Sequence, residues 1–261
     1  MKRGLKVFVS VVSLFVIGLP AFAQPNSKSI TSFTMESFDS VGNQNYMVDG
    51  ESLNWEWGVS ASRFIADGFP KTLYTEGCPL SLREIKRGNG VDLKVYGVEV
   101  SYNRKGDNQF EVYPVKDGER YEIPFVGNVT QVDFWMWGDC YNYTVEVLLK
   151  DCYGKVHALP AGNLFYHGWQ NKIVKVPGWL EQQSRYNAGP KLMTFVGFRI
   201  CTDPEAFVDD FKLFIDEIQY TTNSLSYIYD GYELNEVDFG GSEGSSNDDD
   251  VVEVSEKWKS Y

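Results

Sequence analysis

Few residues of this sequence are candidates for catalysis. No H-E-x-x-H, G-x-S-x-G or glycine-rich phosphate loop occurs, and the only histidines are His157 and His167. Glycoside hydrolysis needs two carboxylates, for which Glu146 or the neighbours Asp209 and Asp210 are candidates. Adjacent residues on a strand point to opposite faces, so Asp209 and Asp210 would not converge on one bond, and Glu146 fits a solvent-facing strand position. We therefore expect no catalytic residues and no enzyme.

Two pairs of tryptophans could instead bind a ligand or a partner. Trp55 and Trp57, and likewise Trp135 and Trp137, are two residues apart, which on a strand places both rings of a pair on one face. Such rings can stack on sugars, fill a core or form a subunit contact. The opposite face of the second pair is also apolar, through Val132, Phe134 and Met136. A strand covered on both sides favours core or interface over an open ligand platform, so we assign the four tryptophans to a partner interface.

The elements that must carry these residues are strands. Strand-like runs are Phe33–Phe38, Leu53–Val59, Val91–Tyr102, Phe110–Val115, Tyr121–Phe125, Val129–Trp137, Tyr143–Lys150, Val156–Leu159, Leu164–His167, Lys172–Val176, Leu192–Cys201 and Phe211–Tyr220. The apolar phase shifts at Gly97, which predicts a β-bulge there. Only Leu80–Arg87 and Trp179–Tyr186 look helical. Many short strands without long helices predict an all-β protein, a jelly-roll or galactose-binding-like β-sandwich over residues 24–222.

A structural calcium is the alternative to having no metal and no cofactor. In jelly-roll carbohydrate modules the first and last strands can jointly hold this ion, which prefers oxygen ligands. Glu36 and Asp39 lie near the first expected strand, and Asp216 and Glu217 lie on the last. Glu36 and Asp216 would be the ligands. The simpler interpretation is that these carboxylates are solvated or accept hydrogen bonds.

The first residues predict export. Lys2, Arg3 and Lys6 precede an apolar run that ends at Pro20, and Ala21-Phe22-Ala23 offers small residues for signal peptidase. The run is shorter than the roughly 18 residues needed to span a bilayer. We expect residues 1–23 to be a signal peptide cleaved after Ala23, which leaves a soluble chain with no membrane contact.

The net charge argues against nucleic acid as a partner, and the C-terminal segment is strongly acidic. The chain has 261 residues with 24 Lys+Arg against 36 Asp+Glu, for a net charge of −12. Nucleic acid is therefore not an expected partner. Residues 223–261 contain the run Gly240–Ser246 and then Asp248-Asp249-Asp250. Such a composition buries little apolar surface, so we expect an acidic, disordered and flexible C-terminal tail.

Four cysteines, Cys78, Cys140, Cys152 and Cys201, lie beyond the signal segment, so an exported chain could form two disulfides in three connectivities. The expected strand Tyr143–Lys150 separates Cys140 from Cys152 by more than a disulfide can bridge. That pairing, and with it Cys78–Cys201, is disfavoured. The other pairings and the reduced state stay open.

An ordered series of segments resembles a known family. The series comprises Glu36-Ser37-Phe38, Trp57-Gly58-Val59-Ser60, Phe134-Trp135-Met136-Trp137-Gly138, Val145–Asp151, Gly154, His157, Gly168-Trp169-Gln170-Asn171, Val176-Pro177, Phe195, Phe198-Arg199-Ile200, Val208-Asp209-Asp210-Phe211 and Asp216-Glu217-Ile218. It is similar to the spirochaete flagellar filament outer layer (sheath) proteins of the FlaA family and covers about residues 33–220. These are strand sequences rather than reactive constellations.

The resemblance implies a structural subunit in the periplasm that coats the flagellin core of periplasmic flagella and contributes to filament shape, stiffness and motility. Its partners would be flagellin core proteins and other sheath subunits. The family has no catalytic residues to carry over. The alternative function is an exported carbohydrate-binding β-sandwich module, for which the tryptophan pairs would supply the sugar contacts.

Overall fold

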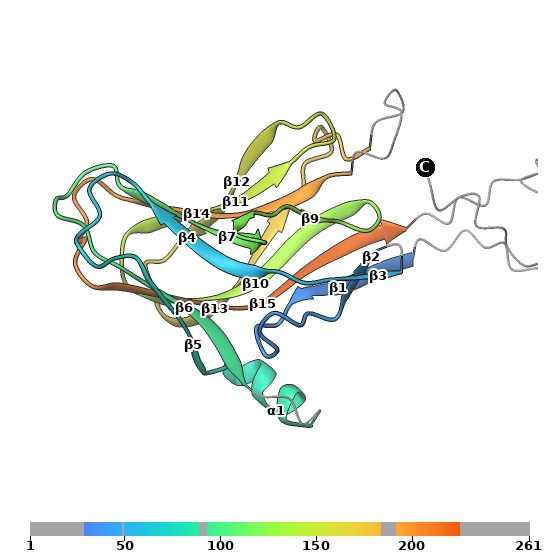
Figure 1. Cartoon of the computed structure of the whole chain (residues 1–261), viewed down its shortest axis with the longest axis horizontal. Helices are drawn as coiled ribbons and strands as arrows, with labels where there is room; N and C mark the ends of the chain where they lie inside the picture. Colours follow the sequence, from blue (N-terminus) through green and yellow to red (C-terminus); the bar gives the residue numbers. More distant parts are fainter. Residues whose placement is uncertain (1–28, 49, 89–92, 184–191, 225–261) are drawn as a thin grey trace, which may run out of the picture.

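The computed structural model describes residues 29–48, 50–88, 93–183 and 192–224 (Figure 1). The expected signal peptide with its cleavage at Ala23, and the acidic segment from residue 225 onward, lie outside the described residues. The last strand continues to Ser224, so the expected boundary at residue 222 falls inside a strand. No helix in the described ranges is long and apolar enough to cross a membrane.

Two antiparallel sheets stack face to face as a β-sandwich (Figure 1). The six-stranded sheet has the order β13 (His167–Lys175), β10 (Val129–Asp139), β15 (Phe211–Ser224), β6 (Lys94–Val100) and β5 (Lys71–Glu76), with β1 (Ser29–Glu36) paired to the far part of β15. The seven-stranded sheet has the order β12 (Val156–Asn163), β11 (Tyr143–Lys150), β14 (Thr194–Thr202), β7 (Gln109–Lys116) and β4 (Glu56–Ala61), with β8 (Glu119–Arg120) on β7 and β9 (Ile123–Pro124) on β14. The expected all-β jelly-roll sandwich is confirmed.

Two small elements complete the fold. A hairpin joins β2 (Tyr46–Val48) to β3 (Glu51–Leu53), and one helix, α1 (Leu80–Gly88), follows β5. In Figure 1, α1 lies on the side of the six-stranded sheet that faces away from the other sheet. The helix expected over Leu80–Arg87 is therefore confirmed.

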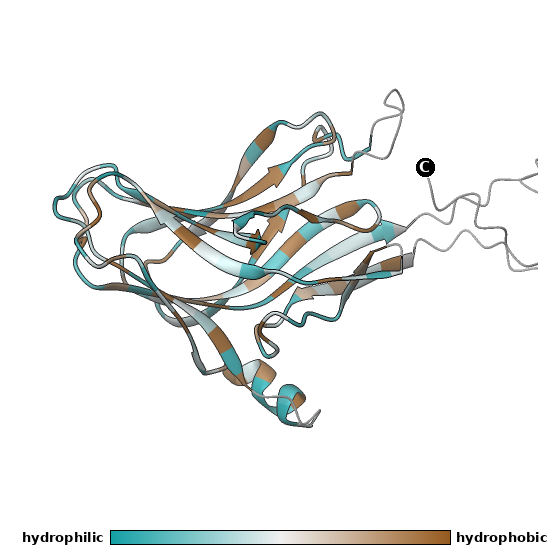
Figure 2. Cartoon of the chain, in the orientation of Figure 1, coloured by the Kyte–Doolittle hydropathy of each residue, from teal (hydrophilic) through white to brown (hydrophobic). Residues whose placement is uncertain are grey.

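The core lies between the sheets and is lined by alternate residues of each strand. Along β10, Val132, Phe134 and Met136 are buried, and the residues between them are half-buried on the other face. Phe134 meets Phe198 of the opposite sheet at a ring-centroid distance of 4.6 Å. Figure 2 shows the resulting alternation of hydrophobic and hydrophilic segments along the strands. This period of two is the pattern that predicts a half-buried strand.

The β-bulge expected at Gly97 is wrong. Pairing runs through Gly97 on both sides without a change of register, to Leu73 on β5 and to Phe214 on β15. The apolar phase shifts because β6 is covered on both faces. Tyr96 and Val98 face the core, whereas Val95 points outward and is buried beneath the segment that contains Gly77.

Two other local expectations are corrected. The run expected at Leu164–His167 is a connection except for His167, which begins β13. This strand ends at Lys175 and includes most of the run expected at Lys172–Val176. Residues 179–183 of the expected helix Trp179–Tyr186 form a turn and an isolated bridge, and residues 184–186 lie outside the described ranges.

A bulge does occur on β15. The register of the β10–β15 pairing shifts between Asp133 and Trp135, and Glu217 on β15 adopts a φ of 46°. A residue with positive φ interrupts the alternation of a strand. Asp216 and the adjacent Glu217 consequently reach the same outward side of the sheet, where both contact α1.

Candidate interaction surface

The four tryptophans expected at an interface separate into two groups. Trp55 and Trp57 are buried, with only 2% and 7% of their surfaces exposed. The indole nitrogen of Trp57 donates to Glu36 Oε2 at 2.9 Å, and Trp55 packs edge-on against Tyr46. The assignment of this pair to a partner interface is therefore corrected. Trp57 on β4 and Trp55 just before it both belong to the core cluster between the sheets.

Trp135 and Trp137 lie on the outer face of the six-stranded sheet. Both are half-buried and alternate with core residues along β10. Trp137 is directly opposite Trp169 on β13, and it packs edge-on against Phe214 on β15 with ring centroids 5.4 Å apart. Trp135 lies opposite Asn171. This pair thus remains available to a partner, and the fold adds Trp169 and Phe214 to it.

Strand register extends this contact into one row across the sheet. Leu73, Gly97, Phe214, Trp137 and Trp169 are successive cross-strand partners on β5, β6, β15, β10 and β13. Residues directly opposite each other in a sheet share a face. We call this set the aromatic row.

Gly97 keeps the row continuous. A Cβ atom at Gly97 would lie 2.8 Å from Cε1 of Phe214 and 3.5 Å from Cγ of Leu73. The phenyl ring therefore occupies space that only glycine leaves free on β6. The ring of Phe214 in turn packs against the ring of Trp137 in a T-shaped contact.

Ion pairs border the row on one side. Glu99 lies 3.5 Å from both Lys71 and Lys212, and Asp139 lies 3.0 Å from the ring of His167. Each of these residues is two positions along its strand from a member of the row, and therefore on the same face of the sheet. The charges at this border therefore largely compensate one another.

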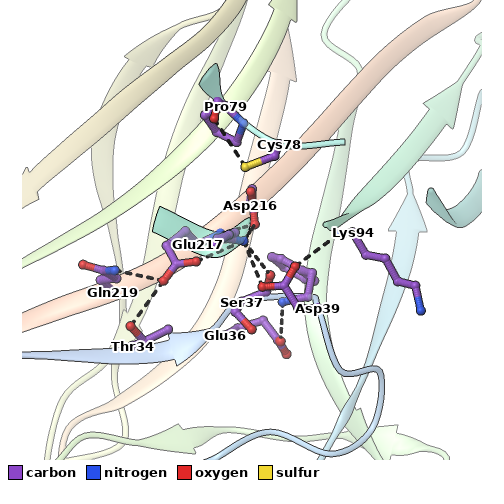
Figure 3. Close-up of polar contacts among 12 residues, drawn as sticks. Thr34, Glu36, Ser37, Asp39, Cys78, Pro79, Lys94, Asp216, Glu217 and Gln219 are labelled. Carbon is purple, nitrogen blue, oxygen red and sulfur yellow. Dashed lines mark hydrogen bonds and ion pairs between the residues drawn. The ribbon is translucent and has the colours of Figure 1, made fainter. Parts of the chain in front are cut away.

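At the other side of the row the carboxylates of Asp39, Asp216 and Glu217 converge (Figure 3). Lys86 of α1 lies among them. Its Nζ atom lies 2.9 Å from Asp216, 3.0 Å from Asp39 and 3.2 Å from Glu217. It also donates to the carbonyl of Ser37 at 3.3 Å. Lys86 and Asp216 are both buried, so this cluster fastens α1 to the sheet.

Burial and charge shift the acid–base properties of this cluster. Burial raises the pKa of Asp216 to about 7, and the Lys86 ammonium works against that shift. Burial alone would lower the pKa of Lys86, but the attraction of Asp216 and Glu217 outweighs it and raises the pKa above its ordinary value. Lys86 is therefore cationic at neutral pH.

These contacts do not fit the calcium alternative. The Lys86 ammonium already occupies the position among the carboxylates that a cation would take. Glu36 is not in that group, because its oxygens accept hydrogen bonds from Trp57, Gln44 and the Phe38 amide. Among the residues that the structure describes, no group of three or more His, Cys, Asp and Glu is placed to hold a metal. We correct the proposed pair Glu36 and Asp216 to protein-bound hydrogen-bond acceptors.

The candidate catalytic carboxylates do not come together. Glu146 on β11 pairs with Arg199 on β14 at 3.5 Å. Asp209 and Asp210 are exposed in the bend before β15, where Asp210 has a φ of 49°. Of the histidines, His157 contacts Asp151 at 2.7 Å and the edge of Trp179, whereas His167 belongs to the border of the aromatic row. Glu146, His157 and His167 therefore belong to local ion pairs, and Asp209 and Asp210 belong to a bend.

The four cysteines are free thiols in the structure. Cys78 and Cys152 are buried, and Cys140 and Cys201 are half-buried. Burial raises the pKa values of Cys78, Cys152 and Cys201, which disfavours the reactive thiolate.

Sequence reasoning missed Lys86, Trp169 and Phe214. The burial of Lys86, with Leu80 and Ile85 exposed on the same helix, is seen only in the structure. Trp169 carried a weak signal, since Trp169 and Asn171 repeat the two-residue spacing of an outward-facing pair. Nothing local assigns Phe214 to the same row, because only the sheet register does so.

Comparison with known proteins defines the family. The class of protein is a two-sheet β-sandwich with a half-exposed aromatic face on one sheet. The sequence model described as "Flagellar filament outer layer protein Flaa" matches residues 43–229. The chain therefore belongs to the FlaA family of flagellar filament outer layer proteins, and the suspected resemblance is confirmed. No curated protein matches the sequence.

Solved structures that resemble this chain include carbohydrate-binding modules. The family 11 module of the cellulosomal cellulase Lic26A-Cel5E of Clostridium thermocellum is 10% identical, with a TM-score of 0.39, and the match covers 77% of this chain and 99% of that one. TmCBM61, solved in complex with β-1,4-galactotriose, is 12% identical, with a TM-score of 0.37 and coverage of 64% and 88%.

Proposed function

We propose that this chain is a structural subunit of the sheath layer around the flagellin core of periplasmic flagella. The observation that carries the proposal is the match of the FlaA family over residues 43–229, which span most of the sandwich. The N-terminal segment supports export, because a basic start, an apolar run and Ala21-Phe22-Ala23 are typical of a secretory signal. The proposed location is thus the periplasm.

The described surface suits a structural role rather than catalysis. Candidate carboxylates are separated into ion pairs and a bend, and His157 and His167 each pair with an aspartate. The aromatic row offers large apolar area with few rotatable bonds, which favours protein contact. We propose that the chain is not an enzyme, that it contacts flagellin and other sheath subunits, and that it adds to filament shape, stiffness and motility.

Imaging filaments from strains with and without this gene tests the proposal. We expect the chain to co-purify with periplasmic filaments, and its deletion to thin the outer layer and to change filament curvature and swimming. A matched strain that expresses the chain without residues 1–23 controls for export, because it should retain the deletion phenotype. Filaments of unchanged diameter and shape in the deletion strain, with the chain absent from wild-type filaments, would contradict the function.

A second candidate is a carbohydrate-binding module. The half-exposed indoles of Trp135, Trp137 and Trp169 on one sheet face favour it, because flat aromatic rings can stack on sugars. Asn171 and Asp133 add hydrogen-bonding groups beside them. Glycan binding by the purified chain that is lost in Trp135→Ala and retained in Trp179→Ala would favour this candidate.

A further inference from the structure

We propose that the outer face of the six-stranded sheet is the surface by which this chain binds a second copy of itself. We define this outer aromatic face as the aromatic row together with Trp135, Ile173 and the exposed side of α1. The inference rests on the proposed sheath function, because a continuous layer requires contacts among its subunits. The outer aromatic face would be the surface that makes these contacts.

The orientation of α1 is the first observation. A surface helix normally turns apolar residues inward and charged residues outward. In α1 the buried residue is Lys86, whereas Leu80 and Ile85 are 76% and 64% exposed. The ion cluster of Lys86 with Asp216 holds the helix in this orientation. Such a helix presents its aliphatic side chains to a partner.

The aromatic row is the second observation, and it adjoins α1. Gly77, which leads from β5 into the helix, packs over Val95, one row along the sheet from the aromatic row. Leu73 at one end of the row is 49% exposed, and Ile173 beside the other end is 59% exposed. The helix and the row therefore form neighbouring parts of one apolar face. Exposed apolar areas of this kind mark interaction sites in soluble proteins.

Charge supports a second copy as the partner. The chain carries a net charge of −12, so two copies repel each other through most of their surfaces. On the outer aromatic face Lys71 and Lys212 flank Glu99, and Asp139 contacts His167. Lys86 lies among Asp39, Asp216 and Glu217 and offsets part of their charge. Like-charged copies can approach most closely through a face where cations lie beside the carboxylates.

The aliphatic residues favour a protein over a sugar. Aromatic rings alone could serve either partner. Leu80, Ile85 and Ile173 contribute exposed aliphatic area that a sugar ring does not need and that a protein interface buries. The combination of indoles on β10 and β13 with exposed aliphatic residues on β5, β13 and α1 matches the composition of a protein contact.

Sedimentation of the purified full chain over a range of concentrations tests the inference. We expect the wild type to associate with increasing concentration. Trp137→Ala removes a central ring and should weaken association by about thirty-fold, as expected for an interface hot spot. Ile173→Asp places a charge at an exposed position and should also shift the chain to monomer without disturbing the core.

Matched controls come from the other sheet and its connections. Trp179 is 64% exposed and Val156 is 46% exposed, and neither lies on the outer aromatic face. Trp179→Ala and Val156→Asp should associate as the wild type does. Thermal unfolding of all four variants identifies any loss of fold, and Ile173→Asp keeps the test valid if Trp137→Ala is unstable.

Each result decides between partners. A wild type that stays monomeric at every concentration, or variants Trp137→Ala and Ile173→Asp that associate like the wild type, would overturn the inference. A monomeric wild type that binds a glycan or purified flagellin cores through Trp137 assigns the face to that partner instead. Absence of the chain from filaments in cells would refute the sheath function, while concentration-dependent association through this face would still stand.

Discussion

The Nζ atom of Lys86 lies 2.9 Å from Oδ1 of Asp216, and this contact joins the only helix of the described residues to the longest strand of the sandwich. Both side chains are buried, and the carboxylates of Asp39 and Glu217 complete the environment of the ammonium. The Lys86 ammonium occupies the position among these carboxylates that a metal ion would take. The contact also turns the aliphatic residues of α1 toward solvent.

Removing the lysine should destabilise the fold. Lys86→Ala leaves buried carboxylates without their cation, for which we expect a loss of about 3 kcal/mol in the free energy of unfolding. Denaturant titration measures it. Lys71→Ala is the control, because Lys71 is exposed and pairs with Glu99 at 3.5 Å, and a surface pair contributes less than about 1 kcal/mol. Equal effects of the two substitutions would show that the Lys86 cluster is not a stabilising contact.

Stability should depend on pH through Asp216. Burial raises the pKa of this carboxyl from 3.8 to about 7 in the folded chain. Between these values the folded state holds more protons than the unfolded state, so the contribution of Asp216 is fully present below about pH 4 and decreases as the pH rises toward 7. Comparison with Asp216→Asn isolates this contribution. The free energy of unfolding of the wild type relative to Asp216→Asn should fall across this range, and a difference that is constant or rises with pH would contradict the assignment.

The buried indole of Trp57 should matter for its hydrogen bond as well as its size. Trp57→Phe retains an aromatic ring but removes the donor that lies 2.9 Å from Glu36 Oε2. We expect a loss of about 2 kcal/mol, because a buried carboxylate loses a partner and the cavity is underfilled. Thermal and denaturant unfolding provide the measurement. Trp179→Phe at an exposed position should be close to neutral, and an equal loss there would point to a general effect of the substitution.

Gly97 should be intolerant of a side chain. Gly97→Ala places a Cβ atom 2.8 Å from the ring of Phe214, for which we expect a cost of about 1–3 kcal/mol from overpacking. Gly178→Ala is the control, since no atom lies within 4 Å of a Cβ there. The double variant Gly97→Ala with Phe214→Leu should recover part of the loss. Failure of this recovery would mean that Phe214 is not the residue that Gly97 accommodates.

The class of fold and the family were accessible from the sequence. Alternation such as that in Tyr143–Lys150 predicts a half-buried strand because the side-chain period of a strand is two, and this strand has the expected bounds. The expected membership of the FlaA family is confirmed over residues 43–229. Both results depend on patterns between residues that are near in sequence or on the order of such patterns along the chain.

The aromatic residues of the surface could be predicted only in part from the sequence. The spacing of Trp55 and Trp57 is the same as that of Trp135 and Trp137, yet the first pair is buried and the second is half-exposed. Periodicity shows that two rings share a face, but it does not show whether that face meets the other sheet or solvent. Gly97 illustrates the same limit, because its phase shift comes from covering both faces of β6 and not from a bulge.

Local patterns and composition were enough to predict most of the strands, the sandwich class, the acidic character and the family. The three-dimensional structure was needed to show that one row contains Leu73, Gly97, Phe214, Trp137 and Trp169, and that Lys86 lies among three carboxylates. Some of these relationships join residues more than a hundred positions apart, such as Gly97 with Phe214 and Lys86 with Asp216. They depend on strand order and register, which are set by the packing of the whole core.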